Sequence, residues 1–147
     1  NIEDPNSLPN SYISNLLSDS KGRLWVGTNN GLCIYLTDQE QFMPIKEAFK
    51  NEILIKEDSQ KRIWICDGSN ITIYDASSDD LEDVRRVAEI NLETALNGEI
   101  ISDFEFLSDS EILVASALEV IIVSINESEN YSVENSSIEY ESNLYKI

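Results

Sequence analysis

Histidine is absent from the 147 residues of this chain, and cationic side chains are scarce. Without histidine, the sequence lacks the commonest general base, the usual zinc ligand and the side chain that titrates near neutral pH. Ten Lys and Arg stand against 28 Asp and Glu, which gives a formal net charge of −18. This balance argues against nucleic acid as a partner, because phosphate binding requires a basic face. It also argues against direct contact with an anionic membrane surface.

Cysteines and long apolar runs are few as well. Cys33 and Cys66 are too few for a disulfide scaffold, and each stands in an apolar run, so we expect two buried thiols, with a disulfide between them as the alternative. No window approaches the roughly 20 apolar residues of a membrane span, and no signal peptide opens the sequence. The sequence has no glycine-rich phosphate loop, and serines without histidine cannot form the usual catalytic triad. We therefore expect no catalytic residue, no metal and no cofactor.

What the sequence does contain is a repeat with an offset of 39 residues. Residues 13–35 read ISNLLSDSKGRLWVGTNNGLCIY, and residues 52–74 read EILIKEDSQKRIWICDGSNITIY. In the first copy Asp19 lies six residues before Trp25, and Tyr35 lies ten after it. The second copy repeats this spacing with Asp58, Trp64 and Tyr74.

A weaker third copy runs from Ile101 to Val123. Its run of residues 112–116 matches residues 24–28 of the first copy, but Leu113 stands where the tryptophan is expected. Val123 falls in the place of the tyrosine, and the turn is shorter by about one residue. The third unit therefore keeps the apolar pattern of the repeat without its aromatic signature.

One copy of the repeat predicts four short strands, at residues 13–17, 24–28, 32–35 and 41–43. The first is a continuous apolar run, which is typical of a fully buried strand. Pro44 suits only an edge position, because it cannot donate a hydrogen bond to a sheet. The last strand of each unit is therefore expected at the edge of an antiparallel sheet.

The turns between these strands have their own signals. Asp19 and Gly22 favour a tight first turn, because aspartate bonds to its own backbone and glycine accepts a positive φ. Asn30-Gly31 is the strongest hairpin signal, since a type I′ turn needs positive φ at both central residues. In the second copy the candidates for the equivalent hairpin turn are Asp67-Gly68 and Ser69-Asn70.

Four strands per repeat of this length, with an aromatic signature, are typical of propeller blades. A β-sandwich is the alternative, but the fixed offset favours blades. We predict an all-β fold, a partial β-propeller of about three four-stranded antiparallel blades in one domain of residues 1–147. The expected blades span about residues 8–48, 49–92 and 98–145. Trp25 and Trp64 are expected to wedge between adjacent blades.

The segment LPNSYISNLLSDSKGRLWVGTNNGLCIY resembles the two-component-regulator propeller repeat. The residues that carry the resemblance are Asp19, Gly22, Leu24, Trp25, Val26, Gly27, Thr28, Gly31, Leu32 and Tyr35. The second copy keeps Asp58, Ile63, Trp64, Ile65 and Tyr74. It departs from the pattern at Cys66-Asp67, where Gly-Thr is expected. The resemblance covers about residues 8–125 and is strong only in the first third.

The resemblance implies a ligand-sensing segment from the periplasmic region of a bacterial membrane-bound hybrid two-component system. In such systems the ligand is typically an oligosaccharide fragment, and a histidine kinase lies outside the propeller. It also implies further blades of the same protein as partners. A protein-interaction scaffold, or part of a propeller-type lyase or glycosidase, remains as an alternative.

Two segments depart from the repeat. Residues 75–99 could hold a helix capped by Ser77 or Ser78, but the repeat favours an edge strand near residues 84–90. The acidic cluster within this segment is expected to be a solvated turn, not a calcium site; it comprises Asp79, Asp80, Glu82 and Asp83. Residues 126–143 are polar, which predicts a solvated linker with one last edge strand near residues 138–141.

Three blades are too few to close a ring, because propellers typically have about four to eight. An open arc exposes an apolar blade face at each end, which is an aggregation hazard. We therefore expect a fragment of a larger propeller that covers its open ends by pairing with another copy. A compact three-blade monomer with an extra covering element is the alternative.

Overall fold

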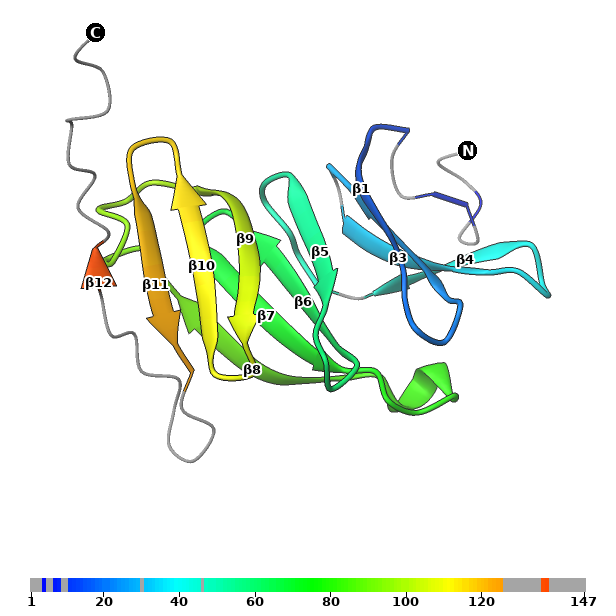
Figure 1. Ribbon diagram of the computed structural model, residues 1–147. Helices are drawn as coiled ribbons and strands as arrows, with labels where there is room; N and C mark the ends of the chain where they lie inside the picture. Colours follow the sequence, from blue (N-terminus) through cyan, green and yellow to red (C-terminus); the bar gives the residue numbers. More distant parts are fainter. Residues whose placement is uncertain are drawn as a thin grey trace, which may run out of the picture.

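The structure is a computed structural model that describes residues 4, 7–8, 11–29, 31–45 and 47–125 and the backbone of 136–137. The strands form three four-stranded sheets, each with its strands in chain order from one edge to the other. All the strand pairs are antiparallel. The sheets, here called blades 1 to 3, stand side by side with blade 2 in the middle (Figure 1). The predicted all-β fold of three four-stranded blades is confirmed.

Blade 1 consists of β1 (Ile13–Ser18), β2 (Leu24–Thr28), β3 (Gly31–Leu36) and β4 (Gln41–Ile45). Pro44 lies in β4, at the edge of the sheet, as predicted. The expectation of a fully buried first strand is wrong, because β1 is itself an edge strand and Leu16 is 56% exposed.

The hairpin of blade 1 closes one residue earlier than Asn30-Gly31 predicted. Thr28 pairs with Gly31, so Gly31 already belongs to β3. The Thr28 hydroxyl donates to the Gly31 carbonyl over 3.0 Å, which holds this end of the ladder together. Asn30 itself lies outside the described residues.

Blade 2 consists of β5 (Ile53–Glu57), β6 (Arg62–Asp67), β7 (Asn70–Asp75) and β8 (Arg85–Asn91). Its hairpin turn is Gly68-Ser69, between the two predicted pairs, because Asp67 pairs directly with Asn70. Gly68 takes a φ of +65°, which glycine accepts without strain.

The segment after β7 contains the predicted edge strand. β8 occupies the place foreseen for it, and the only helical turn in residues 75–99 is a 3-10 turn at Leu81–Asp83. Asp80, not Ser77 or Ser78, caps that turn by accepting from the Glu82 amide.

Blade 3 consists of β9 (Ile101–Ser108), β10 (Glu111–Ser116), β11 (Val120–Ser124) and β12 (Ser136–Ser137). The turn between β9 and β10 has two residues, 109–110, and is thus shorter than its counterparts, as the sequence indicated. The strand predicted near residues 138–141 lies outside the described residues.

Two apolar cores hold the three blades together. One lies between blades 1 and 2 and contains Trp25, and the other lies between blades 2 and 3 and contains Trp64. Trp25 is fully buried and Trp64 is 1% exposed. An aromatic side chain buries on the order of 150–250 Å², so each indole contributes several kcal/mol of hydrophobic stabilisation, about 4 or more.

Strand alternation gives each blade two distinct faces. Trp25, Trp64 and Leu113 occupy the same position of the repeat, and we call the side that carries them the wedge face. The opposite side is the receiving face, which meets the wedge of the preceding blade. Ile55 of blade 2 and Phe104 of blade 3 belong to receiving faces, in the cores with Trp25 and Trp64 respectively.

Candidate functional site

The turn between β1 and β2 is organised around the buried carboxylate of Asp19. Its Oδ1 accepts from the amides of Lys21 (3.0 Å) and Arg23 (2.9 Å). Its Oδ2 accepts from Arg23 Nε (2.6 Å) and from the Trp25 indole Nε1 (2.9 Å). Burial alone would raise the pKa of Asp19, but these hydrogen bonds and the guanidinium charge outweigh it and lower the pKa.

The turn between β5 and β6 repeats this arrangement. Asp58 Oδ1 accepts from the amides of Gln60 (2.9 Å) and Arg62 (2.8 Å), and Oδ2 accepts from Arg62 Nε (2.6 Å) and Trp64 Nε1 (2.8 Å). In both copies the guanidinium carbon lies 5.9 Å from the indole centroid. We call this unit the Asp-Arg-Trp clamp.

The left-handed residue of the two turns differs between the copies. Gly22 has a φ of +77°, as the sequence predicted for this position. Its counterpart 39 residues later is Lys61, which takes a φ of +63° despite its side chain. The clamp therefore imposes the same turn on a residue that disfavours it.

The clamp of blade 1 also reaches into blade 2. Arg23 donates to the carbonyls of Ala76 (2.5 Å) and Ser78 (3.1 Å), in the segment after β7. Ser20 donates through its amide and its hydroxyl to Glu57 over 2.8 and 2.6 Å. Each donor satisfies an acceptor of the neighbouring sheet, so the clamp fixes one blade against the next.

Blade 3 does not carry the clamp. In the repeat alignment Glu111 stands in place of the arginine and Leu113 in place of the tryptophan. Asp109, in the β9–β10 turn of blade 3, instead accepts a hydrogen bond from the Ser59 hydroxyl of blade 2 over 2.5 Å. The clamps therefore secure only the two interfaces within the chain.

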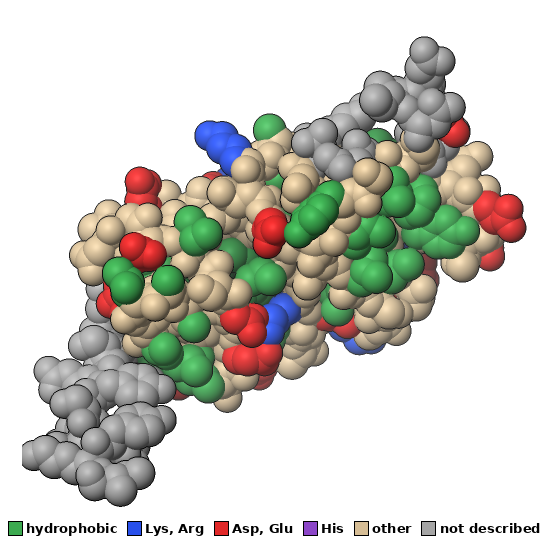
Figure 2. All heavy atoms as spheres, turned by 90° about the horizontal axis from the view of Figure 1, so that it is seen from above, with side chains coloured by type: hydrophobic (Ala, Val, Ile, Leu, Met, Phe, Trp, Pro, Cys, Tyr) green, Lys and Arg blue, Asp and Glu red, His purple; other side chains and the backbone are tan. Residues whose placement is uncertain are grey.

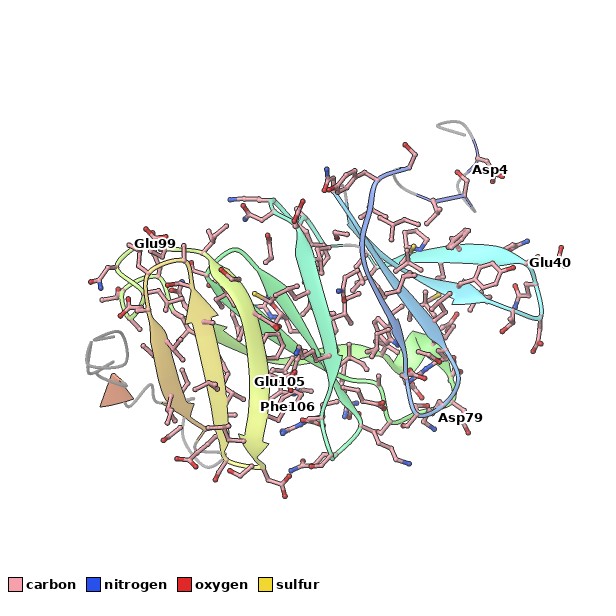
Figure 3. All side chains as sticks on the ribbon, turned by 45° about the horizontal axis from the view of Figure 1, so that its top comes forward. Asp4, Glu40, Asp79, Glu99, Glu105 and Phe106 are labelled. Carbon is pink, nitrogen blue, oxygen red and sulfur yellow. The ribbon has the colours of Figure 1, made fainter. Side chains whose placement is uncertain are left out.

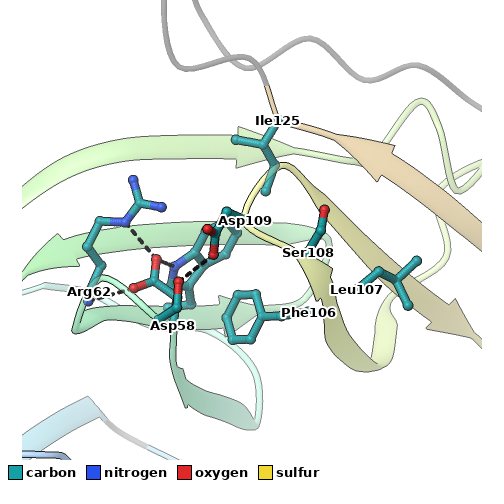
Figure 4. Close-up of a pocket in the computed structure, with 9 residues that line it drawn as sticks. Asp58, Arg62, Phe106, Leu107, Ser108, Asp109 and Ile125 are labelled. Carbon is teal, nitrogen blue, oxygen red and sulfur yellow. Dashed lines mark hydrogen bonds and ion pairs between the residues drawn. The ribbon is translucent and has the colours of Figure 1, made fainter.

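A cavity of about 170 Å³ lies beside the second clamp, between blades 2 and 3 (Figure 4). Trp64 and Phe106 form its aromatic wall, with ring centroids 5.1 Å apart and planes at 81°. Figure 3 places Phe106 on β9, on the side toward blade 2. The full lining is Asp58, Ser59, Arg62, Trp64, Phe106, Leu107, Ser108, Asp109 and Ile125.

The two interfaces differ at the residue that meets the turn serine. Phe106 pairs with Ile112 in the way that Glu57 pairs with Ile63, so Phe106 and Glu57 are equivalent. At the first interface the carboxylate of Glu57 binds Ser20. At the second interface the phenyl ring of Phe106 packs on the indole of Trp64 instead. Ser59, the counterpart of Ser20, binds the Asp109 carboxylate instead. Ser59 and Asp109 both line the cavity beside the aromatic rings.

This lining suits a small neutral molecule with hydroxyl groups. Aromatic walls with a few fixed polar groups are typical of ligand pockets, although those that hold drug-sized ligands are larger, about 300–1,000 Å³. Asp109 can accept a hydrogen bond from a ligand hydroxyl, and Ser108 and Ser59 can both donate and accept. Among the described residues, no group of three or more Cys, Asp and Glu side chains could hold a metal ion.

The other repeat positions serve the packing of the blades. A Cβ on Gly27 would lie 3.2 Å from Ile53 Cβ, so glycine lets blade 2 approach closely here. Tyr74 is 3% exposed in the first interface, whereas Tyr35 is half-buried on blade 1 and packs against Phe42, with ring centroids 4.9 Å apart and planes tilted by 46°.

The acidic cluster of residues 79–83 is accounted for by local contacts. Asp79 binds Lys21 over 2.5 Å, and Asp83 accepts from the Ser78 hydroxyl over 2.8 Å. Figure 3 shows Asp79 at the end of the molecule where the first clamp lies. These side chains bridge the blades and shape the turn before β8.

Both cysteines are free and buried, as predicted. Burial raises the pKa of Cys33 to about 11. Burial, together with the charges of Asp67 and Asp103, raises the pKa of Cys66 to about 12. The thiols are therefore protonated at neutral pH and packed as small apolar groups.

Comparison with known families matches the stretch that contains the first clamp. Residues 7–30 match the model described as "Two component regulator propeller". The chain carries a two-component regulator propeller repeat. The match covers the predicted repeat positions from Asp19 to Thr28. The arginine of the clamp lies in the same stretch and was missed in the sequence, although Arg23 and Arg62 share the 39-residue offset. None of the curated proteins matches the chain.

Solved structures share the fold of this propeller segment. The extracellular domain of the candidate hybrid two-component system BT4673 from B. thetaiotaomicron has a TM-score of 0.64 and 18% identity, covering 93% of this chain. A second structure of that domain, described as a one-component system, has the same score and identity and covers 97%. The corresponding domain of BT3049 from the same organism has a TM-score of 0.61 and 17% identity, covering 100%.

The chain spans 18% of the length of each of these structures. Likeness at this identity shows the fold, an all-β partial propeller. Among the described residues, no helix has the length and apolar character needed to cross a membrane.

Proposed function

We propose that this chain is a ligand-sensing propeller segment from the periplasmic part of a bacterial membrane-bound two-component regulator, and that its ligand is a carbohydrate. The observation that carries the proposal is the propeller-repeat match at residues 7–30, which coincides with the first clamp. The proposal assigns ligand recognition to the propeller segment and leaves a histidine kinase to the rest of the full-length protein.

The cavity beside Trp64 is where we place a sugar ring of that ligand. Its aromatic wall can pack against the apolar C–H face of a sugar, and its rim offers Ser59 and Asp109 to the hydroxyl groups. The high negative charge of the chain favours a neutral sugar over an acidic one.

Binding between two blades also provides a way to transmit a signal. A ligand that contacts Ser59 at the end of blade 2 and Phe106 on blade 3 binds best at one spacing of the two blades. It therefore stabilises that spacing by the difference in its affinity for the two arrangements. Further blades of the same protein would carry the shift toward the membrane.

The test is calorimetric titration of the chain with a panel of neutral mono- and oligosaccharides. Once a ligand is found, Ser59→Ala and Asp109→Asn should each weaken it roughly three- to tenfold, the effect of losing one hydrogen bond. Ser20→Ala is the matched control, because Ser20 holds the equivalent position beside the first clamp. Failure of every sugar to bind, or an equal loss with Ser20→Ala, would contradict the proposal.

A further inference from the structure

The ammonium of Lys56, on the first strand of blade 2, binds two carboxylates of blade 3. Its Nζ lies 3.3 Å from Asp103 and donates a hydrogen bond to Glu105. Burial alone would lower the pKa of Lys56, but the hydrogen bonds and charges of the two carboxylates outweigh it and raise the pKa. The Lys56 side chain is 23% exposed, so water screens these ion pairs only in part.

These ion pairs hold β9, the strand of blade 3 that carries Phe106. Among the described strands, β9 pairs only with β10 and lies at the edge of its sheet. Asp103 and Glu105 lie on the opposite face of β9 from Phe104, because successive side chains alternate along a strand. Lys56 therefore reaches past the edge of β9 and holds the strand from its far side.

A series of aromatic contacts connects Lys56 to the cavity beside the second clamp. Its Nζ lies 5.4 Å from the centroid of the Phe104 ring. That ring meets Phe106 edge-on, with centroids 5.9 Å apart and planes at 89°. Phe106 in turn forms the cavity wall together with Trp64. Because Phe104 is 1% exposed and the interior is close-packed, a displacement at Lys56 is passed on to the wall.

The first interface is held in a different way. Leu17 stands 39 residues before Lys56, and it packs against the core of the first interface. Ser14 and Asn15 of blade 1 accept hydrogen bonds from two amides of β5. The residues 39 positions later are apolar and cannot make the same bonds to β9. At the second interface, Lys56 supplies the polar contact along this strand.

We propose that Lys56 is a positioning residue of the cavity. Its ion pairs hold β9, and with it Phe106, at the spacing from Trp64 that a ligand requires, and ionic strength thereby regulates the affinity of the site. The inference rests on the proposed function, because it concerns the cavity in which we place the sugar. A neutral sugar carries no charge that salt could screen, so a salt dependence of its binding reports on the protein.

The direction of the salt effect distinguishes these ion pairs from the rest of the molecule. The net charge is −18, and Figure 2 shows few cationic side chains among the acidic ones on the face that it presents. Salt therefore relieves repulsion over most of the chain, but it weakens the attraction at Lys56. The affinity for a neutral sugar should fall as salt rises, whereas a general relief of repulsion would draw the blades together and raise it.

The experiment uses the two indole N–H signals in the NMR spectrum of the 15N-labelled chain, assigned with Trp25→Phe and Trp64→Phe. Between about 0.1 M and about 1 M salt, where the Debye length falls from about 10 Å to about 3 Å, the Trp64 signal should move and the Trp25 signal should stay. The ring current of Phe106 makes the Trp64 signal sensitive to the cavity wall. Lys56→Met should move the signal toward its high-salt position and abolish the salt response, whereas Lys56→Arg should retain the response.

Lys21→Met is the matched control. Lys21 pairs with Asp79 across the first interface, and its side chain is 22% exposed. This variant should leave the Trp64 signal and its salt response unchanged. With the neutral sugar that binds most tightly in the panel, Lys56→Met should weaken binding roughly two- to fivefold at low salt, the effect of losing a partly exposed ion pair. At about 1 M salt the variant and the natural chain should bind equally.

Several outcomes would overturn the inference. These are a Trp64 signal that does not respond to Lys56→Met, an equal response to Lys21→Met, and loss of the salt response in Lys56→Arg, which would indicate packing in place of charge. A sugar that binds the natural chain and Lys56→Met equally at low salt would do the same. Binding of no sugar, with the Trp64 response intact, would refute the carbohydrate proposal and leave the role of Lys56 standing.

Discussion

The two interfaces between blades use the same clamp but different partners. Between blades 1 and 2, the Asn15 side-chain oxygen accepts from the Ile55 amide over 3.0 Å, and the Ser14 hydroxyl accepts from the Ile53 amide over 3.3 Å. Between blades 2 and 3, the counterpart contact is the Lys56 ammonium with the carboxylates of Asp103 and Glu105. Backbone-directed hydrogen bonds hold the first interface at this edge, and ion pairs hold the second.

The packing of the two tryptophans differs as well. The core of Trp25 is mostly aliphatic, with Tyr74 as its other buried aromatic residue, and Gly27 lets the strand of the next blade come close. Trp64 packs against Phe104 and Phe106, with ring centroids 6.4 and 5.1 Å away. The same repeat therefore forms a closely packed interface between blades 1 and 2 and an interface with a cavity between blades 2 and 3. The difference comes from the side chains on the first strand of the following blade.

The largest expected effects come from truncating the wedge residues. Trp25→Ala and Trp64→Ala should each lower the free energy of unfolding by about 3–5 kcal/mol, because each leaves a large cavity in a core. Leu113→Ala, at the equivalent position of blade 3 where the side chain is only half-buried, should cost less than about 1 kcal/mol. Urea unfolding gives all three values, and an equal cost at the three positions would contradict the distinction between the buried and the half-buried position.

Removing the clamp carboxylates should cost somewhat less. Asp19→Ala leaves Arg23 and the Trp25 indole without their acceptor, and breaking a buried pair of this kind costs about 3 kcal/mol or more. The Asp58→Ala cost should be smaller, about 2 kcal/mol, because Asp58 borders the cavity and water can replace the carboxylate. Urea unfolding of both variants measures the difference, and a larger cost for Asp58→Ala would reverse the comparison.

The contribution of Asp19 should also depend on pH. The folded state lowers the pKa of Asp19 below its ordinary value of 3.8, so the stabilisation is complete above about pH 5. It is lost as the pH falls through the folded-state pKa, when the carboxylate takes up a proton. The stability difference between the natural chain and Asp19→Asn should therefore shrink between pH 5 and pH 3. A constant difference over this range would show that the ionised form is not what the clamp binds.

A more moderate effect is expected at the glycine of the first interface. Gly27→Ala should cost about 1–3 kcal/mol, because the new methyl group would press on Ile53 and Ser14. Ala115→Val, at the equivalent and only half-buried position of blade 3, should change the stability by less than about 0.5 kcal/mol. Thermal unfolding of the two variants tests the contrast, which fails if Gly27→Ala is neutral.

The smallest effect concerns the left-handed residue of the clamp turns. Lys61→Gly should raise the stability by about 0.5–1 kcal/mol, since a residue with a Cβ pays about that much or more to hold a positive φ. The reverse change, Gly22→Lys, should cost a similar amount at the first clamp. Chemical denaturation measures both, and a loss of stability in Lys61→Gly would show that the Lys61 side chain makes a needed contact.

The repeat spacing predicted the strands and the blades well, because strand alternation and turn residues are local properties. It also identified Asp19, Trp25 and their counterparts. It missed the arginine between them, although the pattern Asp-x-x-x-Arg-x-Trp occurs twice at the same offset. Reading that arginine as a partner of the aspartate requires knowing that the turn brings residues four apart together.

Other features depend on contacts between sheets and leave no local signal. Leu16 resembles a core residue in the sequence, but it lies on the edge strand β1 and is 56% exposed. Phe106 lies on the same side of β9 as Phe104, toward blade 2, but the sequence alone does not show that Trp64 of blade 2 lies opposite it. The cavity needs side chains from two blades, so no single repeat could reveal it.

The central claim is that Trp25 and Trp64 occupy equivalent buried positions in the two interfaces between consecutive blades of one folded unit. Fluorescence of the single-tryptophan variants Trp64→Phe and Trp25→Phe tests it most directly. We predict blue-shifted emission and weak quenching by acrylamide for both indoles, with both signals lost at one common urea midpoint after allowing for the cost of each substitution. An indole with the emission and quenching of a solvent-exposed tryptophan in the folded chain, or two separate unfolding transitions within one variant, would contradict the account.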